Sequence, residues 1–484
     1  MEQNMAYRYG DRSQMALFPQ SIEEYIPADA PVRAYDAFVE ALDFDELGIP
    51  LDPHEVGNSK YYPKTMLKLL VYGYSYGLKS SRKLERETHY NLSFIWLMGG
   101  MKPDHKTISE FRRNNKKALK KVLKQCARLC LELNLIEGNV LFIDGTKIRA
   151  NAATGKTREK AWYKKKLIEL DQRIEELLND CEIIDHQEQH LGSFVSMNKE
   201  LSKTEKLKSK VQKVLEQFKK KDGKKINQTD PDCKIMRSIH GSHASYNVQS
   251  VVDDKNGLIV QAEAVSDEND LGQFARQTEQ ANEILKEPCT IACADNGYAD
   301  TNELEKIDAQ DIKVIVPSRR QALHEGETPF NKSKFTYNKE KDCYYCPKGH
   351  RLRFTGTEKE TGNKRYLIVD KHLCHNCRHF GNCTKGKFGR RIVRLHNEEI
   401  KEKLEFQYEE TSSQKIYARR KDYVEHPFGH IKRNLKTDAF MLRGRHGVQA
   451  ETSLLASCFN IARMITIMGV PGLIEKLSRT VVYA

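Results

Sequence analysis

Two aspartates follow apolar runs that are typical of buried strands. Asp144 ends the run Val-Leu-Phe-Ile before a glycine, and Asp295 follows Thr-Ile-Ala-Cys-Ala. Strand ends in a mixed α/β sheet are common places for ligand sites, and carboxylate oxygens are the ligands that Mg²⁺ prefers. One Asp-Gly alone is typical of a turn. Two such strand ends together predict a metal site suited to reactions at phosphate.

Glu425 is the best candidate for the third carboxylate that such a site needs. Lys432 follows it by seven residues, two helical turns, so the two side chains would share a face if a helix continues through both. A cation there could hold a phosphate of the cleaved strand. His426 and His430 could form a zinc pair in a helix, but Pro427 and Gly429 disturb that spacing. We therefore expect both histidines to flank the site or contact DNA.

A cluster of cysteines predicts a second metal site. Five of the twelve cysteines lie close together in the sequence: Cys343, Cys346, Cys374, Cys377 and Cys383. Two Cys-x₂-Cys pairs are typical of a zinc ribbon, in which thiolates complete a tetrahedral site. Five thiols compete for four places, and spacing alone favours Cys343 with Cys346. The alternative is a cluster of free thiols, as expected for the scattered cysteines elsewhere.

The charge distribution indicates a polyanionic partner. The net charge is +13, and residues 60–124 contain 16 Lys and Arg against four acids. Such a concentrated basic segment favours nucleic acid over a merely solvated helix face. The N-terminus has no apolar signal region, and no run of roughly 18 uncharged apolar residues is present. We therefore expect a soluble cytoplasmic protein without a membrane partner.

Helical and strand-like stretches alternate along the chain, and together they must position these residues. Residues 1–135 have mostly helical periodicity, with helix starts near Pro63, Ser80 and Asp104. Short strands are predicted at 140–150, 246–253, 258–264, 290–294 and 313–317, with helices over 268–286 and 300–308. Residues 157–221 resemble a helical hairpin whose connector lies near 192–196. Residues 318–412 are polar and cysteine-bearing, and helices return after 413.

Together these motifs resemble bacterial insertion-sequence transposases of the DDE class. The matching stretches are Tyr61–Arg113, Phe142-Ile-Asp-Gly-Thr, Tyr246-Asn-Val-Gln, Ala294-Asp-Asn-Gly-Tyr, Val424-Glu-His-Pro-Phe-Gly-His-Ile-Lys, Leu442-Arg-Gly and Asn460-Ile-Ala-Arg. The resemblance implies an α/β protein with an RNase H-like mixed-sheet catalytic core. It also implies Asp144, Asp295 and Glu425 as ligands of catalytic Mg²⁺ or Mn²⁺. Among the cysteines, it favours Cys346, Cys374, Cys377 and Cys383 as ligands of a structural Zn²⁺, with Cys343 as the alternative.

The resemblance also implies a domain plan and a partner. We expect a helical DNA-binding domain at 1–135 and a catalytic domain from 136–156, 222–317 and 413–484. A helical insertion would occupy 157–221, and a zinc-ribbon-like insertion 318–412. The expected partner is double-stranded DNA, both the terminal inverted repeats and the target, bound by a homodimer in the bacterial cytoplasm or nucleoid. The alternative function is a catalytically idle DNA-binding regulator derived from a transposase.

The expected DNA contacts include one departure from the family pattern. Lys432, Lys421, Arg420, Arg112 and Arg113 are the candidates. Related transposases carry a Tyr and an Arg at fixed spacing before the Glu, and that spacing falls on Ala418 and Lys421 here. Tyr417 and Arg420 are each one residue away. Lys421 keeps a cation one turn before Glu425, whereas the role of the tyrosine is unsupported by the spacing.

Overall fold

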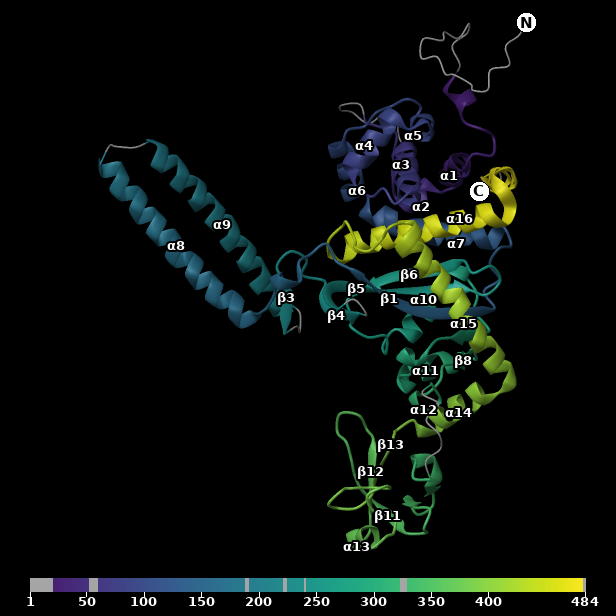
Figure 1. Cartoon of the computed structure of the whole chain (residues 1–484). Helices are drawn as coiled ribbons and strands as arrows, with labels where there is room; N and C mark the ends of the chain where they lie inside the picture. The colour runs from purple at the N-terminus through teal and green to yellow at the C-terminus, as the bar shows by residue number, and fades with distance from the viewer. Residues whose placement is uncertain are drawn as a thin grey trace, which may run out of the picture.

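The structure is a computed structural model that describes residues 21–51, 60–187, 191–220, 224–238, 241–322 and 329–481. The N-terminal residues 1–20, from which no secretory signal is predicted, lie outside these ranges. In Figure 1 a helical N-terminal region lies on one side of a central sheet, a two-helix arm projects sideways, and a small β-rich module hangs from the opposite end. The fold is therefore mixed α/β with a helical N-terminal region, as the sequence predicts.

The N-terminal region is built from short helices. They are η1 (Ile22–Tyr25), α1 (Pro31–Glu40), α2 (Phe44–Leu47), α3 (Pro63–Ser75), α4 (Ser81–Tyr90), α5 (Leu92–Leu97), α6 (His105–Asn114) and α7 (Lys116–Glu132). Pro63 begins α3, because a proline at the first helical position loses no hydrogen bond. The side chain of Asp104 caps α6 by accepting from the Thr107 N–H at 2.7 Å. Both helix starts match the sequence prediction.

The central sheet has six strands. They are β1 (Val140–Arg149), β4 (Lys234–Ser238), β5 (Gly241–Asp253), β6 (Ile259–Val265), β7 (Ile291–Cys293) and β8 (Lys313–Ile315). The order is β4-β5-β1-β7-β8, and β6 also pairs with β5. β1 runs antiparallel to β5 and parallel to β7, and β7 runs parallel to β8. All five predicted strands are present, and β1 ends at Arg149, one residue before the predicted end.

Helices cover the sheet and join it to the N-terminal region. They are α10 (Phe274–Leu285), α11 (Thr301–Asp308), α14 (Glu398–Glu409), α15 (Thr411–Gly429), the π-helical turn η5 (His430–Asn434) and α16 (Gly444–Val481). α15 lies on β1, and α14 packs on β8 and α15. α16 packs on α7, α1, α3 and β6. The N-terminal helices and the sheet therefore share one continuous hydrophobic core.

Helix α16 is the one described helix that is both long and apolar enough to cross a membrane. By length and composition alone it could cross a membrane, but 61% of its apolar window is buried inside the protein. Gly469 has a φ of +71° and bends the helix just before Pro471. A positive φ strains other residues, so glycine suits this bend. The apolar character of α16 is thus explained by its place in the core.

The arm consists of α8 (Lys160–Gln187) and α9 (Leu191–Lys220), which pack against each other. At its base lie η2 (Thr154–Lys156) and the antiparallel pair β2 (Thr157–Glu159) and β3 (Lys225–Asn227). The Tyr163 hydroxyl donates to the carbonyls of Lys156 and Ile226, at 3.0 and 2.9 Å. The connector predicted near residues 192–196 is wrong, because α9 already includes them. Residues 188–190 lie outside the described ranges.

The cysteine module, residues 335–394, is a second sheet with a core of its own. Its elements are β9 (Thr336–Asn338), β10 (Cys343–Tyr345), β11 (Arg351–Thr357), β12 (Lys364–Ile368), α13 (Lys371–His375) and β13 (Arg391–Arg394). The strands pair antiparallel in the order β13-β12-β11-β10-β9. Six buried residues form the core: Phe335, Tyr344, Leu352, Tyr366, Ile368 and Ile392. The short helix α12 (Arg319–Ala322) and the turn η4 (Lys332–Lys334) connect the module to β8.

Candidate active site

The parallel pairing of β1 and β7 places two aspartates side by side. Phe142 pairs with Cys293 in register, and Asp144 and Asp295 each follow their paired residue by two positions. Side chains alternate between the faces of a sheet, so residues two apart point to the same face. Asp295 begins the turn η3 (Asn296–Tyr298), and its side chain accepts from the Gly297 N–H at 2.8 Å. The two strands therefore bring both carboxylates to one edge of the site.

The guanidinium of Arg420 lies between the two carboxylates. Its Nη1 is 3.8 Å from Asp144 Oδ1, and its Nη2 is 3.9 Å from Asp295 Oδ2. The Nη1 atom is buried and donates no hydrogen bond. Lys421, which the family spacing favours, is instead 73% exposed and 4.0 Å from Glu425. Helix α15 thus directs Arg420, and not Lys421, to the aspartates.

The carboxylates at this edge are short of positive charge. The pKa of Asp144 is raised to about 6, mainly by burial and also by the charges of Asp295 and Asp270, against the opposing effect of Arg420. Buried carboxylates that repel one another are stabilised by a cation. Hard oxygen donors of this kind suit Mg²⁺ or Mn²⁺. The donor set of Asp144 and Asp295 therefore fits a divalent cation.

Glu425 and Lys432 line a hollow together with Asp144. The hollow has a volume of about 450 Å³ and is lined by Asp144, Gly145, Thr146, Glu425, Phe428, Gly429, Lys432 and Arg433. The Lys432 ammonium donates to Thr146 Oγ1 at 2.5 Å, and burial lowers the pKa of this lysine. Helix α15 continues through Pro427 to Gly429 and passes directly into η5. The predicted proximity of Glu425 and Lys432 is thus present in the structure.

The carboxylates do not yet surround a common point. Among the described residues, no three Asp, Glu, His or Cys side chains are arranged so that they could hold a metal ion. The Glu425 side chain is 66% exposed and lies 4.0 Å from the Lys421 ammonium. His426 and His430, considered above as a zinc pair, both pack their rings against Phe459 of α16, at 5.4 and 5.5 Å between centroids. This packing gives the two histidines a place beside the site.

Asp270 is a fourth acid near the site that sequence reasoning missed. Its Oδ1 accepts from Asn247 Nδ2 at 2.7 Å and from Gln249 Nε2 at 2.6 Å. A Cβ on Gly145 would lie 2.5 Å from Gln249 Nε2 and 2.6 Å from the same Oδ1, so a larger residue there would displace these side chains. The Tyr298 hydroxyl in turn donates to Gln249 Oε1. The only sequence signal was the acidic run Ser-Asp-Glu-Asn-Asp before α10.

The two arginines of α6 that were candidate DNA contacts differ in their surroundings. Arg112 is only 4% exposed. It donates to the Lys79 carbonyl at 2.6 Å, the Ser81 hydroxyl at 3.0 Å and the Tyr74 hydroxyl at 3.3 Å. Arg113 is 66% exposed and pairs with Glu110 one turn away. Arg112 therefore does not fit the expected DNA contact, because its guanidinium is bound inside the protein, whereas Arg113 is accessible.

Four cysteines line one hollow of the cysteine module. They are Cys346, Cys374, Cys377 and Cys383, and the hollow has a volume of about 270 Å³. Burial raises the thiol pKa of Cys374 and Cys383, and the neighbouring thiols add to it. The Arg390 N–H donates to Cys374 Sγ at 3.4 Å, as backbone amides do around metal-bound sulfur. Cys343 is fully buried in β10 and does not line this hollow.

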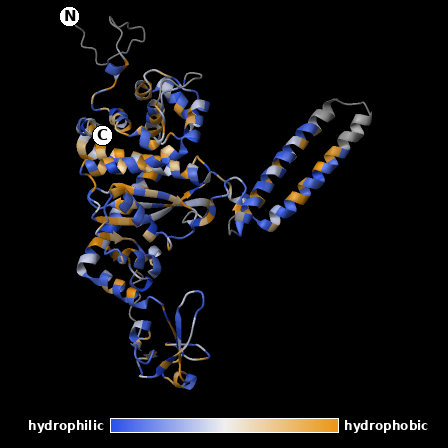
Figure 2. Cartoon of the chain, turned by 180° about the vertical axis from the view of Figure 1, so that it is seen from behind, coloured by the Kyte–Doolittle hydropathy of each residue, from blue (hydrophilic) through white to orange (hydrophobic). Residues whose placement is uncertain are grey.

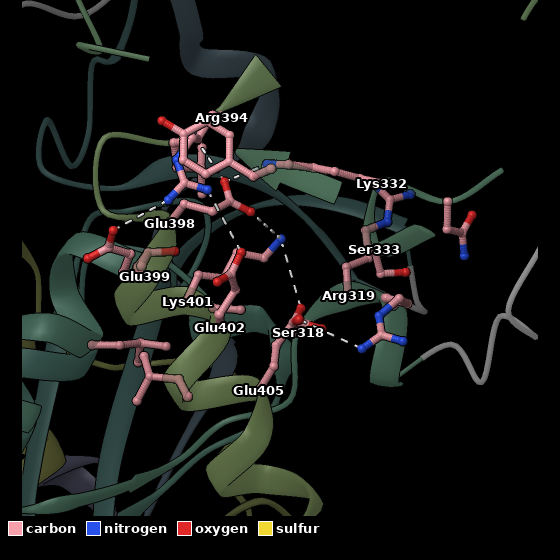
Figure 3. A pocket seen from close by; sticks show the side chains of 18 of the residues that line it. Ser318, Arg319, Lys332, Ser333, Arg394, Glu398, Glu399, Lys401, Glu402 and Glu405 are labelled. Atoms are coloured by element: carbon pink, nitrogen blue, oxygen red, sulfur yellow. Dashed lines mark hydrogen bonds and ion pairs between the residues drawn. The ribbon is translucent and has the colours of Figure 1, made fainter. Parts of the chain in front are cut away.

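A large cavity lies where the cysteine module meets the rest of the protein (Figure 3). Its volume is about 990 Å³, and it lies among α11, α12, α14 and the module. Several of its charges pair with one another: Glu398 with Lys332 and Lys401, and Arg394 with Glu399 and Glu402. These ion pairs join the module to α14 at this junction, and Asn296, which follows Asp295, also lines the cavity.

Comparison with protein families gives two matches. Residues 345–465 match the family described as "Transposase DDE domain", and this range includes Glu425 and Lys432. Residues 20–114 match the family described as "Transposase domain (DUF772)", which covers α1 to α6. No curated protein matches the chain. These two matches support the assignment of the chain to the insertion-sequence transposases of the DDE class.

Proposed function

We propose that the protein binds the ends of its own mobile element, cuts the DNA there and joins the cut strand to a target. The observation that carries this proposal is the juxtaposition of Asp144 and Asp295 on adjacent parallel strands, with Glu425 and Lys432 lining the hollow beside Asp144. Three carboxylates and a cation at one edge suit the transfer of a phosphodiester. The transposase matches supply the substrate class, which is DNA.

We assign the central sheet to the RNase H-like class. The supporting feature is its strand order, β6-β5-β1-β7-β8, in which three antiparallel strands adjoin a parallel pair. The proposed catalytic domain comprises residues 136–156, 222–317 and 413–484, interrupted by a helical insertion at 157–221 and the cysteine-bearing insertion at 318–412. Because helix α14 packs on β8, we propose that the second insertion ends nearer residue 397.

Asp144, Asp295 and Glu425 would hold Mg²⁺ or Mn²⁺. When bound, such ions activate an oxygen nucleophile and stabilise the leaving oxygen at phosphorus. Lys432 and Arg433 line the same hollow, so we propose that the Lys432 ammonium binds a phosphate of the cleaved strand. Arg420 holds the two aspartates in place and neutralises part of their charge. Lys421 is accessible for contact with the DNA backbone.

Cys346, Cys374, Cys377 and Cys383 would hold a structural Zn²⁺. Their shared hollow and the exclusion of Cys343 support this set over the alternative. The thiols are not yet at ligand spacing in the described part of the chain, so small side-chain rotations would have to accompany binding. A bound Zn²⁺ supplies folding energy to a small module.

DNA-end recognition is assigned to the helical N-terminal domain at 1–135. Its basic segment at 60–124 includes Arg113, which is accessible. The protein would act as a homodimer on the paired ends, in the bacterial cytoplasm. Removing residues 1–135 would not test this, because α1, α3 and α7 bury one side of α16. Charge-removing substitutions of exposed residues keep that core intact.

The decisive experiment incubates the purified protein with duplexes that carry the terminal repeats of its own element, with Mg²⁺ or Mn²⁺. We expect nicks at the element boundary and covalent joining of the end to a target plasmid. A protein that binds the ends specifically but cuts with neither ion would be a regulator, and the catalytic proposal would fail.

A further inference from the structure

The arm is the most isolated part of the molecule. Figure 1 shows α8 and α9 projecting from the central sheet, attached only at their base. Their small core comprises Tyr163, Leu170, Val211, Val214 and Ile226. Figure 2 shows many hydrophilic residues along the rest of both helices. Nothing in the carboxylate site or the cysteine module uses this arm.

Five exposed lysines form a stripe along α9. They repeat at alternating intervals of four and three residues: Lys199, Lys203, Lys206, Lys210 and Lys213. At 3.6 residues per turn this spacing keeps them within roughly a quarter of the helix circumference, along about 21 Å. The apolar seam against α8 runs through Leu207, Val211 and Val214, about 100° away from the stripe. The stripe therefore faces outward beside the seam.

The lysines of the stripe differ from the other charges of the arm. Lys208 pairs with Asp171 at 2.7 Å, and Arg173 pairs with Glu200 at 2.8 Å, so both ion pairs join α8 to α9. Within the part of the chain that the structure describes, none of the five stripe lysines has a carboxylate within ion-pair distance. Aligned, uncompensated ammonium groups repel one another, so the stripe costs stability unless an anionic partner is present.

We propose that the lysine stripe of α9 binds the sugar-phosphate backbone of duplex DNA, outside the carboxylate site and independently of base sequence. Each strand of a duplex presents a phosphate about every 3.4 Å, so the stripe would follow roughly six base pairs. Lysine is a compact, mobile point charge, which suits phosphate contact without a fixed geometry. The proposal rests on the proposed function for the identity of the polyanion.

A second protein surface is the less favoured partner. Protein interfaces are depleted of lysine and enriched in aromatic side chains at their centre. The stripe offers neither an aromatic nor an apolar side chain between its lysines; Ser202 and Ser209 flank it. Its chemistry therefore matches a phosphate backbone better than a protein.

The test compares two triple variants of the full-length protein. One is Lys203→Gln, Lys206→Gln and Lys210→Gln in the stripe. The matched control is Lys160→Gln, Lys164→Gln and Lys165→Gln, which removes the same charge from exposed positions of α8. Affinity for a long duplex of unrelated sequence is measured against salt concentration. Each lost phosphate contact lowers the slope of log K against log salt by about 0.9.

We expect the stripe variant to lose about 2 to 3 units of that slope and to bind at least roughly tenfold more weakly at low salt, while the control keeps the wild-type slope. Equal loss in both variants would mean that only net charge matters, and an unchanged slope would mean no contact; either result overturns the proposal. A stripe variant that changes the oligomeric state without DNA, but not the slope, would assign the stripe to protein and also overturn it. The proposed function is tested separately, by end cleavage with the wild-type protein at saturating DNA. That result does not depend on how the lysine variants bind DNA.

Discussion

The carboxylate site and the cysteine hollow are both candidate metal sites, but the chain builds them in opposite ways. The carboxylates come from segments as far apart as residues 144 and 425, and a sheet and a long helix hold them in place. The cysteines lie within 346–383, mostly on turns around α13. The carboxylate site lies on the large hydrophobic core of the protein, which needs no metal. The cysteine hollow lies on a small core of six buried residues. Loss of metal should therefore abolish activity at the carboxylate site, whereas at the cysteine hollow it should unfold the module.

The largest expected effect is at the carboxylates. Asp144→Asn, Asp295→Asn and Glu425→Gln should each reduce end cleavage by at least about a thousandfold, because each removes a proposed metal ligand. DNA affinity and thermal unfolding should stay close to wild type. Gel assays of cleavage and binding measure both.

Asp422→Asn is the matched control for Glu425→Gln, since Asp422 is an exposed carboxylate on the same helix. It should cleave like the wild type. Wild-type cleavage by Glu425→Gln would remove Glu425 from the site.

Substitutions in the cysteine hollow should affect the stability of the cysteine module. Cys374→Ser combined with Cys377→Ser should lose about one zinc per chain and leave the module open to proteolysis, because metal binding supplies part of its folding energy. Elemental analysis and limited proteolysis are the measurements. Cys343→Ala should keep its zinc, since that thiol does not line the hollow. A zinc-free wild-type protein with a protease-resistant module would contradict this assignment.

Within the carboxylate site, Asp270 is expected to orient the groups around Asp144 without being one of the three proposed metal ligands. Asp270→Ala should reduce cleavage by about 10- to 100-fold, the usual effect of losing a group that orients metal ligands, and should raise the Mn²⁺ concentration needed for half-maximal cleavage. The reason is that Asn247 and Gln249 lose their shared acceptor beside Asp144.

Asp267→Ala is the control for this loop, because Asp267 accepts from Gln273 away from the aspartates. It should leave the Mn²⁺ requirement unchanged. Equal effects of the two substitutions would reduce Asp270 to a general structural role.

The smallest effect is expected at the junction between the two regions. Glu398 is 4% exposed and pairs with Lys332, so Glu398→Gln should destabilise the docked module by about 1–3 kcal/mol through loss of charged hydrogen bonds. Hydrogen exchange in the module measures this. Glu399→Gln, at a side chain that is 68% exposed, should change exchange very little. If Glu398→Gln reduced cleavage as much as Asp144→Asn does, docking of the cysteine module would be required for the activity of the carboxylate site.

Much of this protein follows from the sequence alone. Apolar runs predicted every strand that carries an aspartate, and Pro63 and Asp104 predicted two helix starts. These features depend on neighbouring residues, so short segments carry the information. The cysteine spacing likewise predicted a local cluster, although it left Cys343 as an open alternative.

Only the tertiary structure decided which cations and acids meet. One residue along α15 turns a side chain by about 100°, and that difference sends Arg420 to the aspartates and Lys421 to solvent. The helical packing buries Arg112 against Lys79 and Ser81, which no local pattern indicates. Asp270 accepts from Asn247 and Gln249 of β5, and it lies near Asp144 because β5 pairs with β1. Side-chain direction and strand neighbours depend on long-range packing, and the sequence does not express that packing locally.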